Sequence, residues 1–121
     1  MKKTLALVLM LITTVIFAQN KNAKASLEVD GVCLMCKARI EKTCLSTKGV
    51  KSAIWDVKTH ELKLYFDERK TDLKTIEKNI VAAGHDTRNL KAPDKVYGAI
   101  DPCCRYRDQD VINAHTDGKE H

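Results

Sequence analysis

The sequence lacks several features that would place it in common functional classes. Phe, Trp and Tyr make up only 5% of the 121 residues, and 21 Lys and Arg residues are scattered among 16 Asp and Glu residues. A nucleic-acid surface needs basic residues gathered on one face with aromatic side chains among them. We therefore expect no binding of nucleic acid, and we interpret the net charge of +5 as a solvated, mildly basic surface. The chain also has no internal repeat and no low-complexity segment.

No apolar run is long enough to cross a membrane. The longest, residues 5–17, is shorter than the about 20 residues that a spanning helix needs. It follows Lys2 and Lys3 and precedes the small residue Ala18, which is the pattern of a cleavable secretory signal peptide. We therefore expect residues 1–18 to be removed, with no stable membrane insertion afterwards and a periplasmic location. No cysteine lies at the expected cleavage site, so we expect no lipid attachment there.

The remaining chain of about 100 residues is the size of one domain. Its hydrophobic patterns predict six elements in the order βαββαβ. They are strands at residues 26–30, 50–57, 62–66 and, more weakly, 86–91, with helices at 37–46 and between Asp72 and Gly84. This order predicts an α+β sandwich in which two helices cover a four-stranded antiparallel sheet. Residues 19–25 are expected to form a flexible leader, and residues 92–121 a charged tail that contains cysteines.

The five cysteines include a C-x-x-C pair, Cys33 and Cys36, at the start of the first helix. In an oxidising compartment disulfides are possible, but an odd number leaves at least one thiol free or metal-bound in a monomer. The free N–H groups and positive dipole end of a helix start favour thiolate over thiol. Thiolates are soft ligands that select Cu(I), Zn(II) and similar ions. Cys44 lies about 12 Å further along the same helix and is expected in the core.

Residues 27–91 resemble the heavy-metal-associated domain family of small metallochaperones, periplasmic mercury-scavenging proteins and metal-pump modules. The matching residues are Gly31, Cys33, Cys36, Ile40, Glu41, Gly49, Val50 and the run Ala83-Gly84-His85-Asp86. One residue, Val32, separates the glycine from the first cysteine, where the family usually has two. The resemblance implies a ferredoxin-like fold in residues 26–91. It also implies that Cys33 and Cys36 bind a soft cation and pass it to a membrane metal transporter or another metal-binding protein, without enzymatic activity.

Two sulfur ligands suit Cu(I) first and Hg(II) second, whereas Zn(II) normally takes four ligands. His85 enters the expected fourth strand beside the motif, so it is either a third ligand or an ordinary loop histidine. Cys103 and Cys104 follow Pro102 and can reach the motif, because the intervening chain spans up to about 40 Å. Three interpretations stay open for them: a second pair of ligands, which would favour Zn(II), a disulfide, or buried thiols.

The alternative function is a periplasmic thiol–disulfide oxidoreductase that uses the same C-x-x-C pair. Three observations count against it. The strand and helix order differs from that of thioredoxin-like proteins, and no proline lies between Cys36 and Pro93 to supply their cis-proline. The two residues between the cysteines, Leu34 and Met35, are also apolar.

Overall fold

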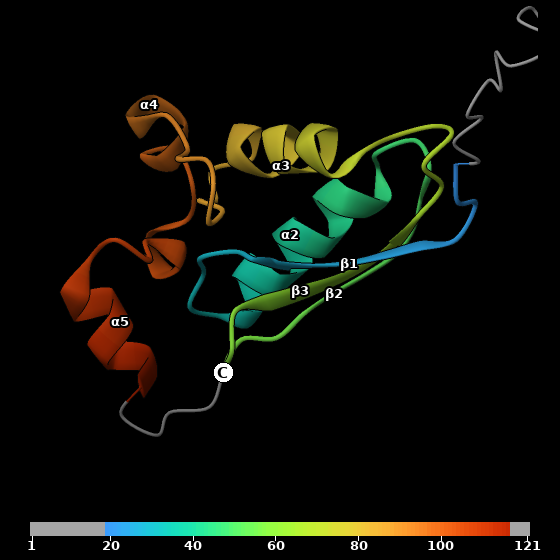
Figure 1. Ribbon diagram of the computed structural model, residues 1–121. Helices are drawn as coiled ribbons and strands as arrows, with labels where there is room; N and C mark the ends of the chain where they lie inside the picture. The colour runs from blue at the N-terminus through green and yellow to red at the C-terminus, as the bar shows by residue number, and fades with distance from the viewer. Residues whose placement is uncertain (1–18, 117–121) are drawn as a thin grey trace, which may run out of the picture.

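The computed structural model describes residues 19–116 (Figure 1). The elements in chain order are β1 (Ala23–Glu28), α2 (Leu34–Leu45), β2 (Val50–Trp55), β3 (Glu61–Phe66), α3 (Leu73–Ala82), α4 (Asp94–Tyr97), the 3-10 turn η1 (Pro102–Cys104) and α5 (Gln109–Thr116). The expected signal peptide, residues 1–18, lies outside the described residues. Within residues 19–116, no helix combines the length and apolar character that a membrane span requires.

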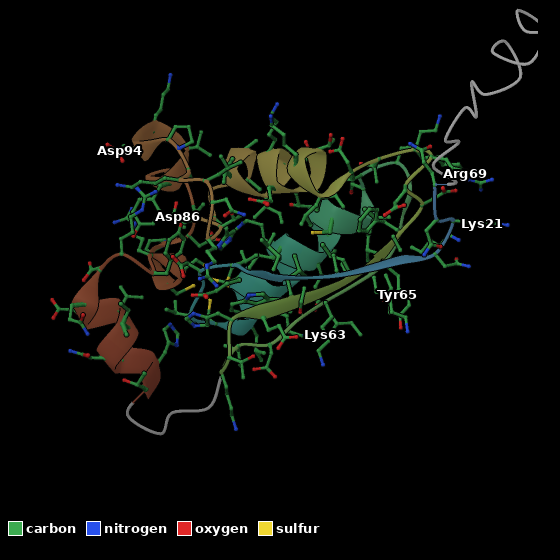
Figure 2. The ribbon with its side chains drawn as sticks, viewed as in Figure 1. Lys21, Lys63, Tyr65, Arg69, Asp86 and Asp94 are labelled. Atoms are coloured by element: carbon green, nitrogen blue, oxygen red, sulfur yellow. The ribbon has the colours of Figure 1, made fainter. Side chains whose placement is uncertain are left out.

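The sheet has three antiparallel strands in the order β1–β3–β2. Leu62 of the central strand pairs with Leu27 on one side and with Trp55 on the other. Alternate side chains point to opposite faces of a strand, so the sheet has one buried and one open face. The buried face carries Leu27, Ala53, Trp55, Leu62, Leu64 and Phe66. Lys63 and Tyr65 point to the open face, away from the helices (Figure 2).

Helices α2 and α3 both cover the buried face of the sheet (Figure 1). Helix α2 buries Cys36, Ile40 and Cys44, whose spacing of four residues places them on one side of a helix. Each of these three side chains is 0% exposed. The helix is followed by Gly49, which has a φ of 99° and so occupies the left-handed region that glycine tolerates. The chain can therefore reverse sharply into β2.

Helix α3 begins at Asp72, whose side chain accepts a hydrogen bond of 2.7 Å from the N–H of Thr75. This bond satisfies one of the free N–H groups at the helix start. Ile76 and Ile80 lie on one side of α3 and are buried against the core. Asp72 is therefore the N-cap residue of α3.

The fourth strand expected at residues 86–91 does not form as a strand. It is reduced to an isolated bridge between Val29 and Thr87. The N–H of Thr87 donates to the carbonyl of Leu90, and the N–H of Leu90 donates to the side-chain oxygen of Thr87. This tight turn directs the chain away from β1 after one residue pair. Within the described residues, the sheet is three-stranded rather than four-stranded.

The ends of the domain also differ from expectation. Strand β1 begins at Ala23, which is 5% exposed, so residues 23–25 of the expected flexible leader belong to the sheet. Residues 92–116 do not extend away as a simple tail. They fold into α4, η1 and α5 on one end of the sandwich, where Ile100, Cys104 and Tyr106 are buried (Figure 1).

Candidate metal centre

Cys33 and Cys36 lie at the first turn of α2. Cys33 is the N-cap residue of α2. Its backbone is extended, and its side chain makes no hydrogen bond that caps the helix. Its carbonyl accepts the N–H of Lys37 at 3.1 Å, so the helical turn starts directly at the motif. The two Sγ atoms are 3.3 Å apart. The C-x-x-C spacing therefore places the two sulfurs close enough to bind one ion, as the sequence predicts.

The loop before Cys33 is held close to Trp55. The indole N–H of Trp55 donates to the carbonyl of Val29 at 2.9 Å. At Gly31, an added Cβ would lie 2.9 Å from the Trp55 ring and 3.0 Å from the Cβ of Cys36. Only a residue without a side chain allows this approach. Trp55 thus sets the path of the loop that presents the first cysteine.

Two charged residues of α2 fasten the motif helix to the end of β2. The Glu41 carboxylate accepts the N–H of Trp55 at 2.8 Å and the Lys37 ammonium at 2.6 Å. The Lys37 ammonium also donates to the carbonyl of Trp55 at 2.8 Å. These bonds satisfy backbone groups at the end of a strand, which would otherwise lack partners. They fix the first turn of α2 relative to the sheet.

The C-terminal segment brings a third and a fourth thiol to the motif. The Sγ of Cys104 is 3.3 Å from that of Cys33, and the carbonyl of Cys104 is 3.9 Å from the Sγ of Cys36. The sulfur atoms of Cys33, Cys103 and Cys104 all lie within 4.8 Å of one another. Cys103 is exposed, and its Sγ lies 3.4 Å from the Sδ of Met35. We call Cys33, Cys36, Cys103 and Cys104 the thiol cluster.

Tyr106 anchors the segment that carries Cys104. Its hydroxyl donates to the carbonyl of Gly84 at 2.7 Å and accepts the N–H of Asp86 at 2.8 Å. Its ring stacks on His85, with ring centroids 5.4 Å apart. Because Tyr106 is 7% exposed, these bonds are sheltered from water. The fold therefore holds Cys104 against the motif from its C-terminal side.

Arg107 strengthens this anchor. Its guanidinium donates to the Asp86 carboxylate at 2.8 Å, to the carbonyl of Ala92 at 2.8 Å and to the Asp94 carboxylate at 3.1 Å. It also lies over the ring of Tyr97, 4.1 Å from its centroid. A planar guanidinium makes several directed bonds at once. One side chain thus ties the last part of the chain both to the domain and to α4.

The thiols of the cluster differ in acidity. Burial alone raises the pKa of Cys33, but the N–H of Cys36 and the thiols of Cys104 and Cys36 hydrogen-bond to its sulfur and bring its pKa below the ordinary value. Burial raises the pKa of Cys36 and of Cys104. The helix start therefore favours the thiolate at one cysteine of the pair rather than at both. Cys44, buried in the core, has its pKa raised to about 12 by desolvation.

Arg39 places a positive charge beside the cluster. It donates to the Asp101 carboxylate at 2.5 Å and lies 3.3 Å from the Nε2 of His85. Burial lowers its pKa, but a hydrogen bond to the sulfur of Cys104 and the charge of Asp101 outweigh this and raise it. A guanidinium in this position offsets part of the negative charge of a thiolate group.

His85 has both ring nitrogens engaged. Its Nδ1 donates to the carbonyl of Asp30 at 2.9 Å, since a carbonyl only accepts. Its Nε2 then accepts from Arg39, which only donates. This arrangement requires the neutral ring, and burial lowers the pKa of His85 to about 4. The structure thus places His85 beside Arg39 and Tyr106. Its role as a ligand stays a prediction, and it would require Arg39 to move.

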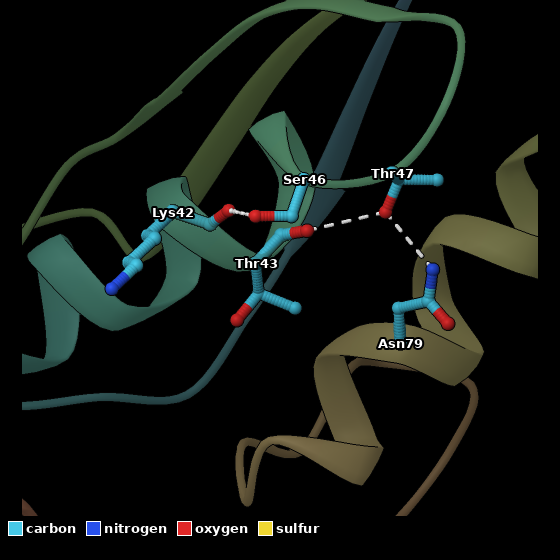
Figure 3. A pocket seen from close by; sticks show the side chains of 5 residues that line it. All are labelled: Lys42, Thr43, Ser46, Thr47 and Asn79. Carbon is cyan, nitrogen blue, oxygen red and sulfur yellow. Dashed lines mark hydrogen bonds between the residues drawn. The ribbon is translucent and has the colours of Figure 1, made fainter.

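An open pocket of about 340 Å³ lies at the other end of α2, against α3 (Figure 3). The polar groups of its lining residues form hydrogen bonds with one another. Ser46 donates to the carbonyl of Lys42, Thr47 donates to the carbonyl of Thr43, and the amide of Asn79 donates to the hydroxyl of Thr47. It contains no thiol, and we assign no chemistry to it.

Comparison with known proteins identifies the domain that carries the C-x-x-C pair. Residues 26–86 match the heavy-metal-associated domain family, which accounts for about half of the chain. The chain belongs to the heavy-metal-associated domain family. None of the curated proteins compared with the chain matches it. The match ends before Cys103 and Cys104, so the thiol cluster joins two cysteines of the heavy-metal-associated domain to two from outside it.

Solved structures of the same fold include a metallochaperone and a domain of a potential copper-translocating ATPase. The CopZ metallochaperone is 24% identical, with a TM-score of 0.52 over 54% of this chain and 98% of that one. Oxidized MerP from Ralstonia metallidurans CH34 is 24% identical, with a TM-score of 0.52 over 55% and 93%. The N-terminal domain of a potential copper-translocating P-type ATPase from Bacillus subtilis, solved in the Cu(I)-loaded state, is 19% identical, with a TM-score of 0.52 over 55% and 84%. At these identities the likeness shows the ferredoxin-like α+β fold.

The sequence indicates some residues of this centre and not others. Met35 and Arg39 lie within one turn of the C-x-x-C pair, so their proximity to it follows from helical spacing. Tyr106 and Arg107 carry no recognisable signal, because their side-chain hydrogen-bond partners lie 13 or more positions away in the chain. A tyrosine and an arginine directly after a cysteine pair are interpretable only once the fold is known.

Proposed function

We propose that this protein is an exported carrier of a soft heavy-metal ion, which it captures with the Cys33–Cys36 pair and passes to a partner. The observation that supports this most directly is the thiol cluster, which joins the two motif cysteines of a heavy-metal-associated domain to two cysteines from outside it. Thiolate sulfur is the ligand that thiophilic cations prefer. Metal binding needs no water or other reacting group, so the proposal includes no enzymatic activity.

Cu(I) is the preferred cargo, followed by Hg(II) and Zn(II). The buried sulfurs of the thiol cluster are those of Cys33, Cys36 and Cys104, which are 5%, 0% and 0% exposed. A set of three sulfurs suits the low coordination numbers of Cu(I) and Hg(II), whereas structural Zn(II) takes four ligands. Binding by all four thiols, with Cys103 turned away from Met35, would favour Zn(II) instead. Arg39 offsets part of the negative charge that three thiolates would leave around a monovalent ion.

The partner that we propose is a membrane metal transporter or another metal-binding protein. Among the structures of the same fold, one is a metallochaperone and another is a domain of a potential copper-translocating ATPase. Transfer between such proteins requires ligands that exchange one at a time, which thiolates allow. Export to the periplasm rests on the N-terminal pattern of residues 1–18.

Native mass spectrometry of the reduced protein tests the proposal. The wild type is loaded with Cu(I), Hg(II) or Zn(II) in separate samples and compared with Cys33→Ser, Cys104→Ser and Cys44→Ser. We expect one ion per chain in the wild type and in Cys44→Ser, and loss of the ion in Cys33→Ser. Cys44 is the matched control because it is a buried thiol on the same helix, outside the cluster. Absence of any bound cation in the wild type contradicts the proposal.

The surroundings of Cys33 also fit the alternative function, a thiol–disulfide oxidoreductase. Cys33 has a lowered pKa and lies 3.3 Å from two other sulfurs, which is also a geometry for thiol–disulfide exchange. However, Cys33 is only 5% exposed, whereas a catalytic thiol must contact its substrate. Insulin reduction by the metal-free protein separates the two functions. Turnover without metal binding would favour the oxidoreductase.

A further inference from the structure

The sulfur atoms around the centre fall into a buried and an exposed group. Cys33, Cys36 and Cys104 are almost fully buried. Cys103 is exposed, and Met35 is 49% exposed. A soft ion held by a partner protein in solution therefore has no direct access to the three buried sulfurs. Some part of the protein has to bring the ion in.

Opening of the C-terminal segment is a costly way to give access. The segment that carries Cys104 is held on one side by the ion pair between Arg39 and Asp101. On the other side it is held by the buried hydroxyl of Tyr106 and by Arg107. Opening the segment would break these bonds together and would expose the buried side chains of Ile100 and Tyr106 to water, so the closed arrangement is favoured. The segment that carries Cys104 therefore stays packed against the motif.

Met35 and Cys103 offer a second path. Their sulfur atoms lie 3.4 Å apart at the surface, although the residues are 68 positions apart in the chain. The same Cys103 sulfur lies within 4.8 Å of the sulfurs of Cys33 and Cys104. Both a thioether and a thiolate are soft donors. We infer that Met35 and Cys103 form an exchange position, through which a soft cation enters and leaves the buried thiols; this inference rests on the proposed function.

The exchange proceeds by replacing one sulfur ligand at a time. An arriving cation binds first to the Met35 thioether and the Cys103 thiolate. The sulfurs of Cys33 and Cys104 then displace the thioether, and Cys36 displaces the Cys103 thiolate. Each thiol that binds releases its proton to the solvent, and the released Cys103 thiolate takes one up. The metal keeps its oxidation state throughout. Because the thioether is neutral and binds more weakly than a thiolate, the ion is not retained at the surface.

The test compares rates with equilibrium affinities. Full-length reduced protein is mixed with Cu(I) held by a coloured chelator, and both uptake and the return of Cu(I) to excess chelator are followed by absorbance. The variants are Met35→Leu, which keeps the apolar bulk, and Cys103→Ser. Leu34→Ala is the matched control, since Leu34 is 51% exposed in the same turn and carries no sulfur. Cys104→Ser reports the loss of a buried ligand.

We expect uptake and release to slow several-fold in Met35→Leu and in Cys103→Ser, with little change in equilibrium affinity. Leu34→Ala should match the wild type, and Cys104→Ser should lose more than about tenfold in affinity. The inference is wrong if Cys103→Ser loses as much affinity as Cys104→Ser, because Cys103 is then a resident ligand. It is also wrong if both rates equal those of Leu34→Ala. A wild type that binds no Cu(I) overturns the proposed function itself.

Discussion

The Sγ atoms of Cys33 and Cys104 lie 3.3 Å apart, although 71 positions separate these residues in the chain. Cys33 is also 3.3 Å from Cys36, so it is the shared neighbour of both other buried thiols. It is the one of the three whose pKa lies below the ordinary value. Cys33 is therefore the central thiol of the three in position, and its surroundings favour the thiolate form.

Mild oxidation of the metal-free protein should form a disulfide that contains Cys33. A thiolate attacks faster than a thiol, and both Cys36 and Cys104 are within reach of Cys33. Diamide treatment should remove two thiols rapidly from the wild type, as measured by thiol titration. Cys33→Ser should lose this fast phase and Cys44→Ser should keep it. Peptide mapping that finds a Cys36–Cys104 bond as the main product in the wild type would contradict this expectation.

Alkylation of the reduced, metal-free protein should proceed in a defined order. Cys103 is exposed and should react with iodoacetamide first. Cys44 and Cys104 should react last, because both are 0% exposed and desolvation raises the pKa of each, so little thiolate is present near pH 8. Mass spectrometry of digested samples taken over time measures the order. In denaturant the difference should vanish, and a Cys44 that reacts early under native conditions would show that the core is open.

Tyr106→Phe should destabilise the fold by about 1–3 kcal/mol, the typical cost of leaving a buried polar group without its partner. The lost hydroxyl bonds to the carbonyl of Gly84 and to the N–H of Asp86. Urea unfolding followed by circular dichroism measures the change. Tyr65→Phe is the matched control, because Tyr65 is 41% exposed on the open face of the sheet and should have little effect. Equal stability of the two variants would rule out the anchoring role of Tyr106.

Gly31→Ala should cost about 1–3 kcal/mol, as overpacking in a tight core does. The new methyl group would lie 2.9 Å from the ring of Trp55 and 3.0 Å from the Cβ of Cys36. Because Trp55 is the single tryptophan, its fluorescence should report the displacement. Gly98→Ala is the comparison, since its nearest neighbour, the carbonyl oxygen of Asp94, is 3.2 Å away and its φ of −65° is ordinary. A smaller loss of stability in Gly31→Ala than in Gly98→Ala would count against this packing.

The stability of the metal-free protein should fall between about pH 6.5 and pH 4 because of His85. Burial holds its pKa at about 4 in the folded state, so in this window the unfolded chain binds more protons. Stability therefore rises with pH across the window, by about 3 kcal/mol if His85 acts alone. The groups that face the ring are the carbonyl of Asp30, the Arg39 guanidinium, which lowers the pKa further, and the Asp86 carboxylate, which raises it.

Urea unfolding at a series of pH values, with the wild type and His85→Gln side by side, measures this effect. The variant should show a flatter dependence above about pH 5, where most carboxyl groups are already ionised. Above about pH 7 both proteins should show little further change. A variant with the same slope as the wild type would assign the pH dependence to other groups.

Local patterns in the sequence determine the sandwich and the C-x-x-C pair. The spacing of Cys36, Ile40 and Cys44 specifies the buried side of a helix, and the alternation around Trp55 and Leu62 specifies strands. These patterns arise from repeats of 3.6 and 2 residues, so they can be recognised without knowing the fold. Glycines at turns and an aspartate at a helix start mark where elements end and begin, and these signals are also local in the sequence.

Tertiary structure alone decides how residues 86–116 run. The weak pattern at residues 86–91 is compatible with a strand, but the turn between Thr87 and Leu90 and the bonds of Arg107 direct the chain back over the motif. No periodicity encodes a contact between residues 71 positions apart, because it depends on the whole path between them. By itself the sequence therefore determines the domain and its two motif cysteines. Whether Cys104 joins them, and whether Cys103 stays exposed, depends on long-range packing around Tyr106.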